Sequence, residues 1–377
     1  MKVVFSNTIF FLQKNGGISR YFVNLNKELR KNKINSKIIA PINKNIYLKK
    51  SDSNNISFFI KRFPRNFFLY KLNNFLFSYF LKKENPDIIH ETYFDKNNLN
   101  ILKNKIKIVT IYDLIHEKFS KFYSKEKSLE KNKILKNVDH FVCISKKTQN
   151  DFINYYNIPT KKTSVIYLGC DHLKKYKKKN NFKLKDEYFL YVGDRNGYKN
   201  FAILCEAINK SKKLKNMKVI CFGGGKFSNQ EIKKYNLKSN FINYQGNDFL
   251  MSNLYKNARA YINTSKYEGF GIPNIEAMYL GCPVITSDFS VFKEIGGNSI
   301  LFFKNGDYKD LANKMIYFLD KKNRDIYIKR GIKNSKKFTW SKCAIQTKDL
   351  YESLVKTRNN HNNNLSSFSV FLKKKIN

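Results

Sequence analysis

The sequence predicts an α/β fold with two doubly wound, parallel-sheet domains, each opening with a strand, a glycine loop and a helix. Short apolar runs alternate with segments whose apolar residues recur at helical spacing, as in strands joined by helical crossovers. The strand–glycine–helix opening occurs twice, starting with residues 2–6 and with residues 188–192. A chain of 377 residues is long enough for two domains with a core each.

The first domain begins with the apolar run 2–6, then Gly16 and Gly17, then a helical pattern. Glycines between a strand and a helix let the backbone approach a ligand, so Gly16 and Gly17 are candidate binding residues, with a plain structural turn as the alternative. Further strands of this domain are expected at 37–41, 87–90, 106–112, 140–145 and 163–168.

Polar side chains follow two of these expected strands. His90 and Glu91 end one strand, and Asp113 and His116 follow the next. Ligands of open α/β sheets bind at the carboxyl ends of the strands, so these residues are expected at a binding site. For His116 the alternative is a loop histidine whose hydrogen bonds are satisfied within the protein.

The segment 58–83 is rich in Phe, Tyr and Leu but is interrupted by Lys, Arg and Asn. Pro64 favours a helix that begins near it over a helix that runs through it. Two interpretations stay open. The segment is either a buried amphipathic helix or an interfacial helix with an aromatic and basic face.

The second domain is expected to open with the strand 188–192, followed by a glycine turn that carries Arg195 and Lys199. An arginine holds phosphate oxygens with its planar fork, and a lysine adds a point charge, so both are candidate phosphate ligands. Further strands are expected at 218–222, 241–244, 260–264 and 284–286.

Changes in amino-acid composition along the chain indicate where the domains begin and end. We expect a first domain at 1–178, a second at 179–340, a last helix at 341–356 and a disordered basic tail at 357–377. The boundary falls in a Lys- and Asn-rich stretch with few apolar residues, and the tail has a similar composition.

The segment 264–285, TSKYEGFGIPNIEAMYLGCPVI, combines two carboxylates with a helix start. Glu268 and Glu276 stand eight positions apart, with glycines between them that let a ligand approach the backbone. Pro273 suits a first helical turn, whose free N–H groups form an anion site. Glu276 lies one turn inside this helix. A diphosphate between a sugar and a ribose would fit this arrangement.

This run resembles the signature of the GT-B glycosyltransferases of family 4, and the resemblance extends over residues 1–355. It implies two Rossmann-like domains that face a central cleft, with the helix 341–356 crossing back to the first domain. It also implies a nucleotide-diphosphate sugar as donor, retention of the anomeric configuration, and no required cofactor or metal.

The resemblance also implies roles for single residues. Glu276 would accept hydrogen bonds from the ribose, and Glu268 would hold the hexose. Many family members carry a histidine where this chain has Tyr112, and His116 is the nearest substitute. The implied catalytic residues are Glu268, Arg195, Lys199, Asp113 and His116. The implied donor-binding residues are Gly16, Gly17, Arg195, Lys199, Tyr244, Phe270, Gly271, Ile272 and Glu276.

The runs GGISRYF, YVGDRNGYKNF and YEGFGIPNIEAM resemble bacterial mannosyltransferases of surface-polysaccharide assembly. We therefore expect transfer of a hexose, first mannose from GDP-mannose, to a glycan or lipid-linked glycan. Two alternatives are another GT-B enzyme, such as a sugar-nucleotide epimerase, and a basic nucleic-acid-binding protein.

The formal net charge of +43 is spread along the whole chain. Such a charge favours anionic partners, among them an acidic membrane surface. No nucleic-acid-binding motif is present, so nucleic acid is not an expected partner. The six cysteines show no metal-ligand spacing and indicate a reducing compartment. No apolar run reaches 18 residues, and we expect a cytoplasmic enzyme at the inner face of the plasma membrane.

Overall fold

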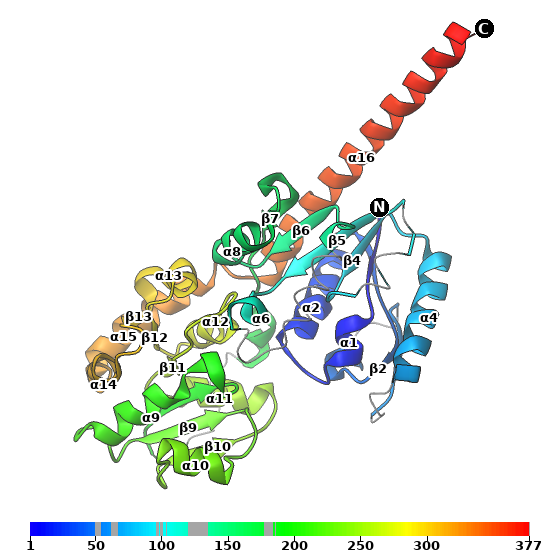
Figure 1. The fold of residues 1–377 in the computed structure, drawn as a ribbon. Helices are drawn as coiled ribbons and strands as arrows, with labels where there is room; N and C mark the ends of the chain where they lie inside the picture. Colours follow the sequence, from blue (N-terminus) through cyan, green and yellow to red (C-terminus); the bar gives the residue numbers. More distant parts are fainter. Residues whose placement is uncertain are drawn as a thin grey trace.

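The computed structural model describes residues 1–49, 54–61, 67–95, 98, 101–102, 104–119, 135–176, 184 and 186–376, with side chains described up to residue 360. Two α/β domains lie side by side, each built on one parallel sheet (Figure 1). The predicted fold class is therefore confirmed.

The first sheet has the strand order β3-β2-β1-β4-β5-β6-β7. Its strands are β1 Lys2–Phe5, β2 Asn35–Asn43, β3 Ile56–Phe59, β4 Ile88–Glu91, β5 Ile106–Ile111, β6 His140–Cys143 and β7 Thr163–Val165. Val3 and Val4 point to opposite faces of β1, and both are fully buried, so both faces of the sheet are covered. The chain direction across the sheet reverses between β1 and β4, which is where such folds bind ligands.

The second sheet repeats this topology with the order β10-β9-β8-β11-β12-β13. Its strands are β8 Tyr188–Val192, β9 Lys218–Phe222, β10 Phe241–Tyr244, β11 Tyr261–Asn263, β12 Val284–Ser287 and β13 Leu301–Phe303. Here the reversal lies between β8 and β11. The glycine loop after β8 and the two-glutamate segment after β11 therefore meet at one edge of the sheet.

Helices connect the strands in both domains. In the first domain they are α1 Thr8–Leu12, α2 Gly17–Lys31, α3 Ile46–Lys49, α4 Phe67–Glu84, α6 Ile115–Lys118 and α8 Lys146–Tyr156. In the second they are α9 Phe201–Lys210, α10 Asn229–Tyr235, α11 Asp248–Asn257, α12 Ile272–Tyr279, α13 Ser290–Gly296, α14 Tyr308–Tyr317 and α15 Lys321–Ser335, and α16 Trp340–Ile376 ends the chain.

Helix α4 has one buried face, as the first interpretation of the segment 58–83 expects, and the interfacial interpretation stays a prediction. It begins at Phe67, past Pro64, and buries Asn73, Phe77 and Leu81 against the sheet. Its opposite face is apolar as well and lies in solvent.

Helix α16 returns to the first domain and packs against α2 (Figure 1). Its Tyr351 hydroxyl lies 2.5 Å from Nδ1 of His90, whose Nε2 lies 2.8 Å from Oγ1 of Thr110. Burial lowers the pKa of His90 to about 3, so the imidazole is neutral. His90 is thus a buried link between β4, β5 and α16, which corrects its expected place at a binding site.

Helix α16 also continues to Ile376, where residues 357–377 were expected to be a disordered tail. Residues 341–376 contain no glycine or proline, so nothing in this stretch forces the helix to stop. The expected domain boundary at residues 178 and 179 lies outside the described residues, between β7 and β8.

Candidate active site

The two-glutamate segment is docked directly on the first domain. The carbonyl oxygen of Gly269 accepts hydrogen bonds from Oγ of Ser145 at 2.7 Å and from Oγ1 of Thr148 at 2.9 Å. A Cβ on Gly269 would lie 1.6 Å from the carbonyl oxygen of Tyr112 and 3.2 Å from Cβ of Asp113. Only glycine fits here, and its close approach brings the second-domain segment against the strand end that carries Asp113.

The start of helix α12 faces the glycine loop of the first domain. Gly271 has a φ of +87°, a left-handed conformation that glycine adopts without strain, and Pro273 follows in the first turn. Cδ1 of Ile272 lies 3.6 Å from the Cβ position of Gly17. The helix N-terminus, which attracts anions, is thus next to Gly17, and the binding role of Gly16 and Gly17 stays a prediction.

Phe270 does not face the cleft. Its ring is 2% exposed and packs edge-on against Phe338 at 5.9 Å, with Tyr167 equally close. The side chain of Phe270 therefore belongs to the core, and its donor contact stays a prediction. Tyr244 ends β10, and its carbonyl oxygen accepts a hydrogen bond from the backbone N–H of Gly223, so it holds two strand ends together.

Lys199 and Glu268 form an ion pair at the mouth of the second-domain loops. Nζ of Lys199 lies 2.5 Å from Oε1 of Glu268, which also accepts a hydrogen bond from Oγ of Ser265 at 2.9 Å. The hydroxyl of Thr264 donates to the backbone carbonyl of Lys199 at 2.7 Å. The glycine loop after β8 and the segment after β11 are therefore joined at the two predicted residues.

Arg195 lies on the same loop but points away from the cleft. Its Nε donates to Glu231 at 2.7 Å, and its other N–H groups reach the backbone carbonyls of residues 223–226 at 3.1–3.3 Å. All five donors of the guanidinium are used, and the residue is 3% exposed. In this structure Arg195 therefore holds the loop after β9, and its role as a phosphate ligand stays a prediction.

Asp113 and His116 line a cavity of about 190 Å³ between the domains, with Ile18 of the first glycine loop and Tyr198 of the second domain. Oδ1 of Asp113 accepts a hydrogen bond from the N–H of Ile115 at 3.0 Å, which fixes the start of α6. The predicted pair is thus brought together beside both glycine loops.

Tyr112 lines the same cavity, and its ring packs edge-on against Tyr21 and Phe22 at 6.0 and 6.4 Å. Burial raises the pKa of its phenol well above the ordinary value. The phenol of Tyr112 therefore stays protonated near neutral pH.

Glu276 lies in a network of charges that sequence reasoning missed. Its Oε1 is 3.8 Å from Nη1 of Arg20 and 3.4 Å from Nε2 of His172, and its side chain is largely buried. Arg20 lies in the first turn of α2, directly after the glycine loop of the first domain, and its side chain reaches across to the second domain. The only sequence signal is its place four residues after Gly16, which does not distinguish it among 72 basic residues.

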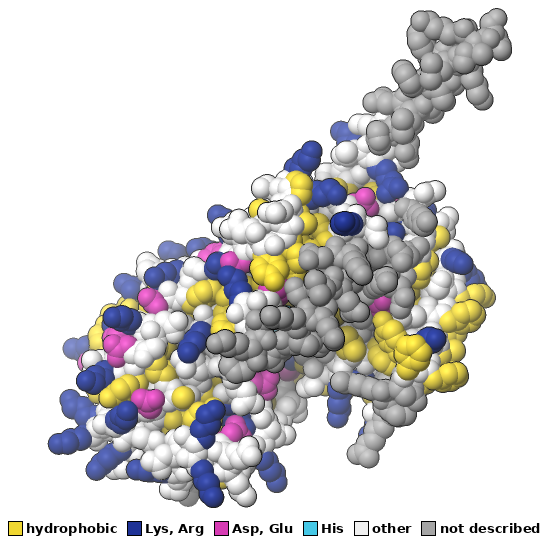
Figure 2. Space-filling model, in the orientation of Figure 1, with side chains coloured by type: hydrophobic (Ala, Val, Ile, Leu, Met, Phe, Trp, Pro, Cys, Tyr) yellow, Lys and Arg dark blue, Asp and Glu magenta, His cyan; other side chains and the backbone are white. Residues whose placement is uncertain are grey.

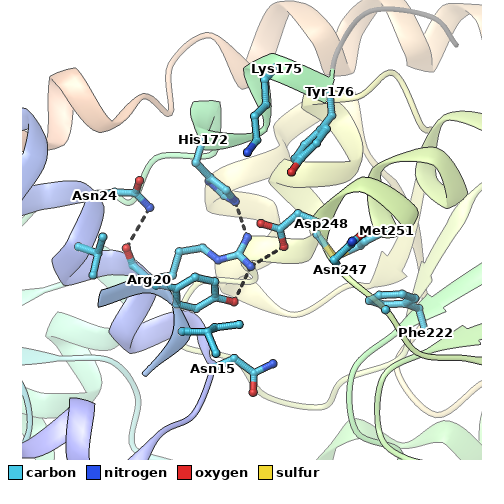
Figure 3. Close-up of a pocket in the computed structure, with 14 residues that line it drawn as sticks. Asn15, Arg20, Asn24, His172, Lys175, Tyr176, Phe222, Asn247, Asp248 and Met251 are labelled. Carbon is cyan, nitrogen blue, oxygen red and sulfur yellow. Dashed lines mark hydrogen bonds and ion pairs between the residues drawn. The ribbon is translucent and has the colours of Figure 1, made fainter. Parts of the chain in front are cut away.

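Arg20 makes further contacts around a cavity of about 410 Å³ (Figure 3). Its Nη2 donates to Oδ1 of Asp248 at 2.7 Å and to the hydroxyl of Tyr47 at 2.6 Å, and its Nη1 lies 2.6 Å from Nε2 of His172. Burial opposes the charge of Arg20, but Glu276, Tyr47 and Asp248 raise its pKa overall, so the guanidinium stays charged.

Comparisons with known proteins agree with this architecture. Residues 15–172 match the model of Glycosyltransferase Family 4, and residues 173–337 match that of Glycosyl transferases group 1. The chain is 26% identical over 245 residues to O-antigen chain mannosyltransferase B of Escherichia coli, covering 61% of this chain and 64% of the relative. It is 31% identical over 183 residues to O-antigen chain mannosyltransferase RfbU of Salmonella typhimurium, covering 46% and 49%.

Solved structures share the fold at low identity. Sucrose-phosphate synthase from Thermosynechococcus elongatus aligns with a TM-score of 0.74 at 19% identity, over 94% of this chain and 99% of that one. Anabaena HepE, solved in complex with UDP, aligns with a TM-score of 0.71 at 16% identity, over 94% and 100%. With both domain models matched and this topology, the chain belongs to the GT-B glycosyltransferases, with a Family 4 first domain and a group 1 second domain.

Proposed function

We propose that this protein transfers mannose from GDP-mannose to a glycan or lipid-linked glycan during surface-polysaccharide assembly, with retention of configuration. The similarity to two O-antigen mannosyltransferases supports the sugar and the pathway class, although the matched regions span only 64% and 49% of those relatives. The observation that carries the proposal is the Lys199–Glu268 pair beside the N-terminus of α12, opposite Gly17.

Each group at this site has a chemical task. The N–H groups at the start of α12 and the ammonium of Lys199 stabilise negative charge on the leaving diphosphate. Glu268 accepts hydrogen bonds from hexose hydroxyls, and Glu276 accepts them from the ribose. Asp113 and His116 lie on the acceptor side, where they can orient the attacking hydroxyl. In a same-face transfer with retention, the proton of that hydroxyl passes to the leaving diphosphate as the new glycosidic bond forms and the old one breaks. No metal or cofactor takes part.

The test is release of nucleotide from sugar nucleotides, measured with and without a lipid-linked glycan. Release that depends on the acceptor is expected. Conversion of the sugar nucleotide without acceptor would instead identify an epimerase. In Glu276→Ala, donor affinity should fall at least about tenfold, because hydrogen bonds to a carboxylate contribute roughly 1.5–3 kcal/mol each. Glu206→Ala, which removes an exposed carboxylate on α9, is the control.

We further propose that the first domain works at an acidic membrane surface. Phe68, Leu72, Phe75 and Tyr79 recur every three or four residues along the outer face of α4, and Phe68 and Phe75 are 72% and 69% exposed. Figure 2 shows this apolar surface at the right-hand edge of the molecule. None of the described helices is long and apolar enough to cross a bilayer.

Charge favours acidic lipid as the partner of this face. Residues 58–83 contain six lysines and arginines and no aspartate or glutamate. Aromatic rings at the headgroup level with flanking basic side chains are typical of interfacial helices, and each basic residue near an anionic surface contributes about 1 kcal/mol.

Co-sedimentation with vesicles tests this surface. We expect binding to vesicles with acidic lipid, weaker binding at high salt, and little binding to neutral vesicles. The triple variant Phe68→Ser, Phe75→Ser, Tyr79→Ser should lose binding. A control variant, Tyr317→Ser with Ile326→Ser, removes exposed apolar side chains from the second domain and should bind normally. A different outcome would assign the surface to a second copy of the chain: the wild type would be a dimer that binds acidic and neutral vesicles equally, and the triple variant would be a monomer.

A further inference from the structure

The chain crosses between the two domains twice, and the two crossings touch each other. The first crossing leaves β7 and begins with the short 3-10 helix η3, Asp171–Tyr176. The second leaves α15 and ends at Trp340, the first residue of α16. The carboxylate of Asp171 accepts a hydrogen bond from the backbone N–H of Trp340 at 2.8 Å. A Cβ on Gly169 would lie 2.3 Å from that same backbone nitrogen, so the two crossings are in direct contact.

His172 lies at this junction, among three polar groups. Its Nδ1 is 3.2 Å from the indole Nε1 of Trp340, and its Nε2 is 2.6 Å from Nη1 of Arg20 and 3.4 Å from Oε1 of Glu276. Figure 3 shows the imidazole directed toward the guanidinium of Arg20. The side chain of His172 is 9% exposed, so these three neighbours, rather than bulk water, determine its hydrogen bonding.

The neighbours make opposite demands on the imidazole. The indole of Trp340 and the guanidinium of Arg20 can only donate hydrogen bonds, so each needs a ring nitrogen that accepts. An ionised carboxylate such as that of Glu276 can only accept, so it needs the ring proton on Nε2. A neutral imidazole has one accepting nitrogen and one N–H group. It can therefore satisfy only one of the two donors at a time.

Two arrangements of the ring proton follow, and one of them serves Glu276. When Nδ1 accepts from Trp340, the proton is on Nε2 and faces Glu276. When Nε2 accepts from Arg20, the proton is on Nδ1, and the indole N–H loses its partner. The indole is the group that needs the imidazole more, because Trp340 is 4% exposed and an unpaired buried donor is costly. Arg20 has further acceptors in Tyr47 and Asp248.

The carboxylate of Glu276 is approached from one side only. Both Arg20 and His172 lie near Oε1, at 3.8 and 3.4 Å. Within the described part of the chain, Oε2 makes no hydrogen bond or ion pair, so it can accept from a ligand. A carboxylate that a neighbour already holds in one rotamer loses less side-chain entropy when that ligand binds.

We propose that His172 is a positioning residue that holds Glu276 ready for the ribose of the donor, and that the indole of Trp340 keeps His172 in the tautomer that does so. The inference rests on the proposed function, which supplies the role of Glu276. It adds a connection between the junction of the domains and the donor site. A domain movement that separates Trp340 from His172 would release Glu276, so donor affinity depends on how the domains sit.

The test is a double-mutant cycle on His172 and Trp340, with nucleotide affinity measured by calorimetric titration of the full chain. GDP, UDP and ADP are titrated into the wild type, and the one that binds most tightly is used for the variants. His172→Phe keeps a ring but removes both nitrogens, so affinity should fall about tenfold. Trp340→Phe removes the indole N–H, and affinity should fall about threefold. The double variant should lose no more than His172→Phe alone, because the indole acts through the imidazole.

His140→Phe is the matched control. This histidine of β6 is 6% exposed, and its Nε2 lies 2.8 Å from Oγ of Ser164, so its replacement should leave nucleotide affinity unchanged. The Tm of every variant is measured alongside. A role of His172 in stability alone would lower Tm while the folded variant binds nucleotide normally, and that result overturns the inference.

The remaining outcomes separate the inference from the proposed function. Normal nucleotide affinity in His172→Phe, with sugar transfer by the wild type, overturns the inference and leaves the transferase standing. Losses that multiply to about thirtyfold in the double variant overturn the route from Trp340 through His172. If His172→Phe does not fold, unchanged affinity in Trp340→Phe overturns the inference by itself. A wild type that binds none of the three nucleotides and transfers no sugar overturns both.

Discussion

Replacing Arg195 with alanine should lower the thermal stability of the second domain while leaving the turnover of the folded enzyme largely unchanged. The guanidinium pairs with Glu231, stacks over the ring of Phe227 at 4.7 Å, and donates to four consecutive carbonyls of the loop after β9. Arg195→Ala removes the buried partner of Glu231 and leaves those carbonyls without their donors. The substitution should therefore disorder the loop after β9 and lower the free energy of unfolding.

The size of the effect follows from the burial of the pair. Removing one member of a buried, hydrogen-bonded ion pair costs about 3–5 kcal/mol. Arg195 is 3% exposed, so solvent screening reduces this little. A domain of this size loses about 2–4 °C in Tm per kcal/mol, which gives a decrease of roughly 6–20 °C.

Thermal and urea unfolding would measure the loss of stability, and kcat would be measured at a temperature where the variant is folded. Arg330→Ala is the control. This exposed arginine makes one long hydrogen bond, 3.5 Å to the carbonyl of Asn298, and lies over the ring of Tyr327 at 5.5 Å, so its removal should change neither quantity appreciably. An unchanged Tm combined with a kcat reduced a hundredfold or more would show that Arg195 serves the diphosphate after all, and would refute the structural role.

Three further predictions test neighbouring features. Lys199→Ala should lower kcat by about 10²- to 10³-fold with little change in Tm, because its charge stabilises the leaving group, and a chelator should leave the wild type active. Gly269→Ala should lower the free energy of unfolding by about 1–3 kcal/mol or more and also lower activity, because the added Cβ would overlap the Tyr112 carbonyl. Gly17→Ala is the control and should fold normally, because its added Cβ would lie 3.6 Å from Cδ1 of Ile272, an ordinary contact. The hydrogen bond from Arg195 lowers the pKa of Glu231 below its ordinary 4.5. This pair therefore stabilises the fold fully above pH 4.5 and progressively less below it, and urea unfolding at pH 3–6 should show a smaller acid loss in Glu231→Gln than in the wild type.

Most of the fold could be predicted because local sequence signals agreed with the global topology. Continuous apolar runs such as 188–192 are typical of parallel strands buried on both faces, and each was followed by turn residues and a helical pattern. The length of the last helix could not be predicted in this way. Its apolar positions fade beyond residue 355, but without a helix-breaking residue the backbone continues to Ile376.

Helix α4 shows a second limit of periodicity. A helix that is apolar on two faces has no clear amphipathic pattern, so sequence alone could not choose between a buried and an interfacial helix. The structure shows that one face, with Phe77 and Leu81, packs on the sheet, while the other, with Phe68 and Phe75, lies in solvent.

The candidate site was predictable where backbone conformation dictated residue type. Gly269 and Gly271 occupy places that a side chain would block or strain. Lys199 and Glu268 lie in the two loops that the sheet topology brings together. These assignments depend on the main chain, which the order of strands and turns determines. Side-chain direction does not follow from that order.

The two arginines illustrate this difference. Arg195 follows a glycine turn at a strand end, but its long side chain turns back to the carbonyls of the neighbouring loop, which compete for its donors as a phosphate would. Arg20 lies on a helix of the other domain, and nothing local marks it, yet it reaches Asp248 and approaches Glu276 because the domains meet there. A cation at a ligand site is thus specified by which acceptors lie within reach after folding. For a chain with 72 basic residues, that information resides in the contact between the domains rather than in the spacing of any one motif.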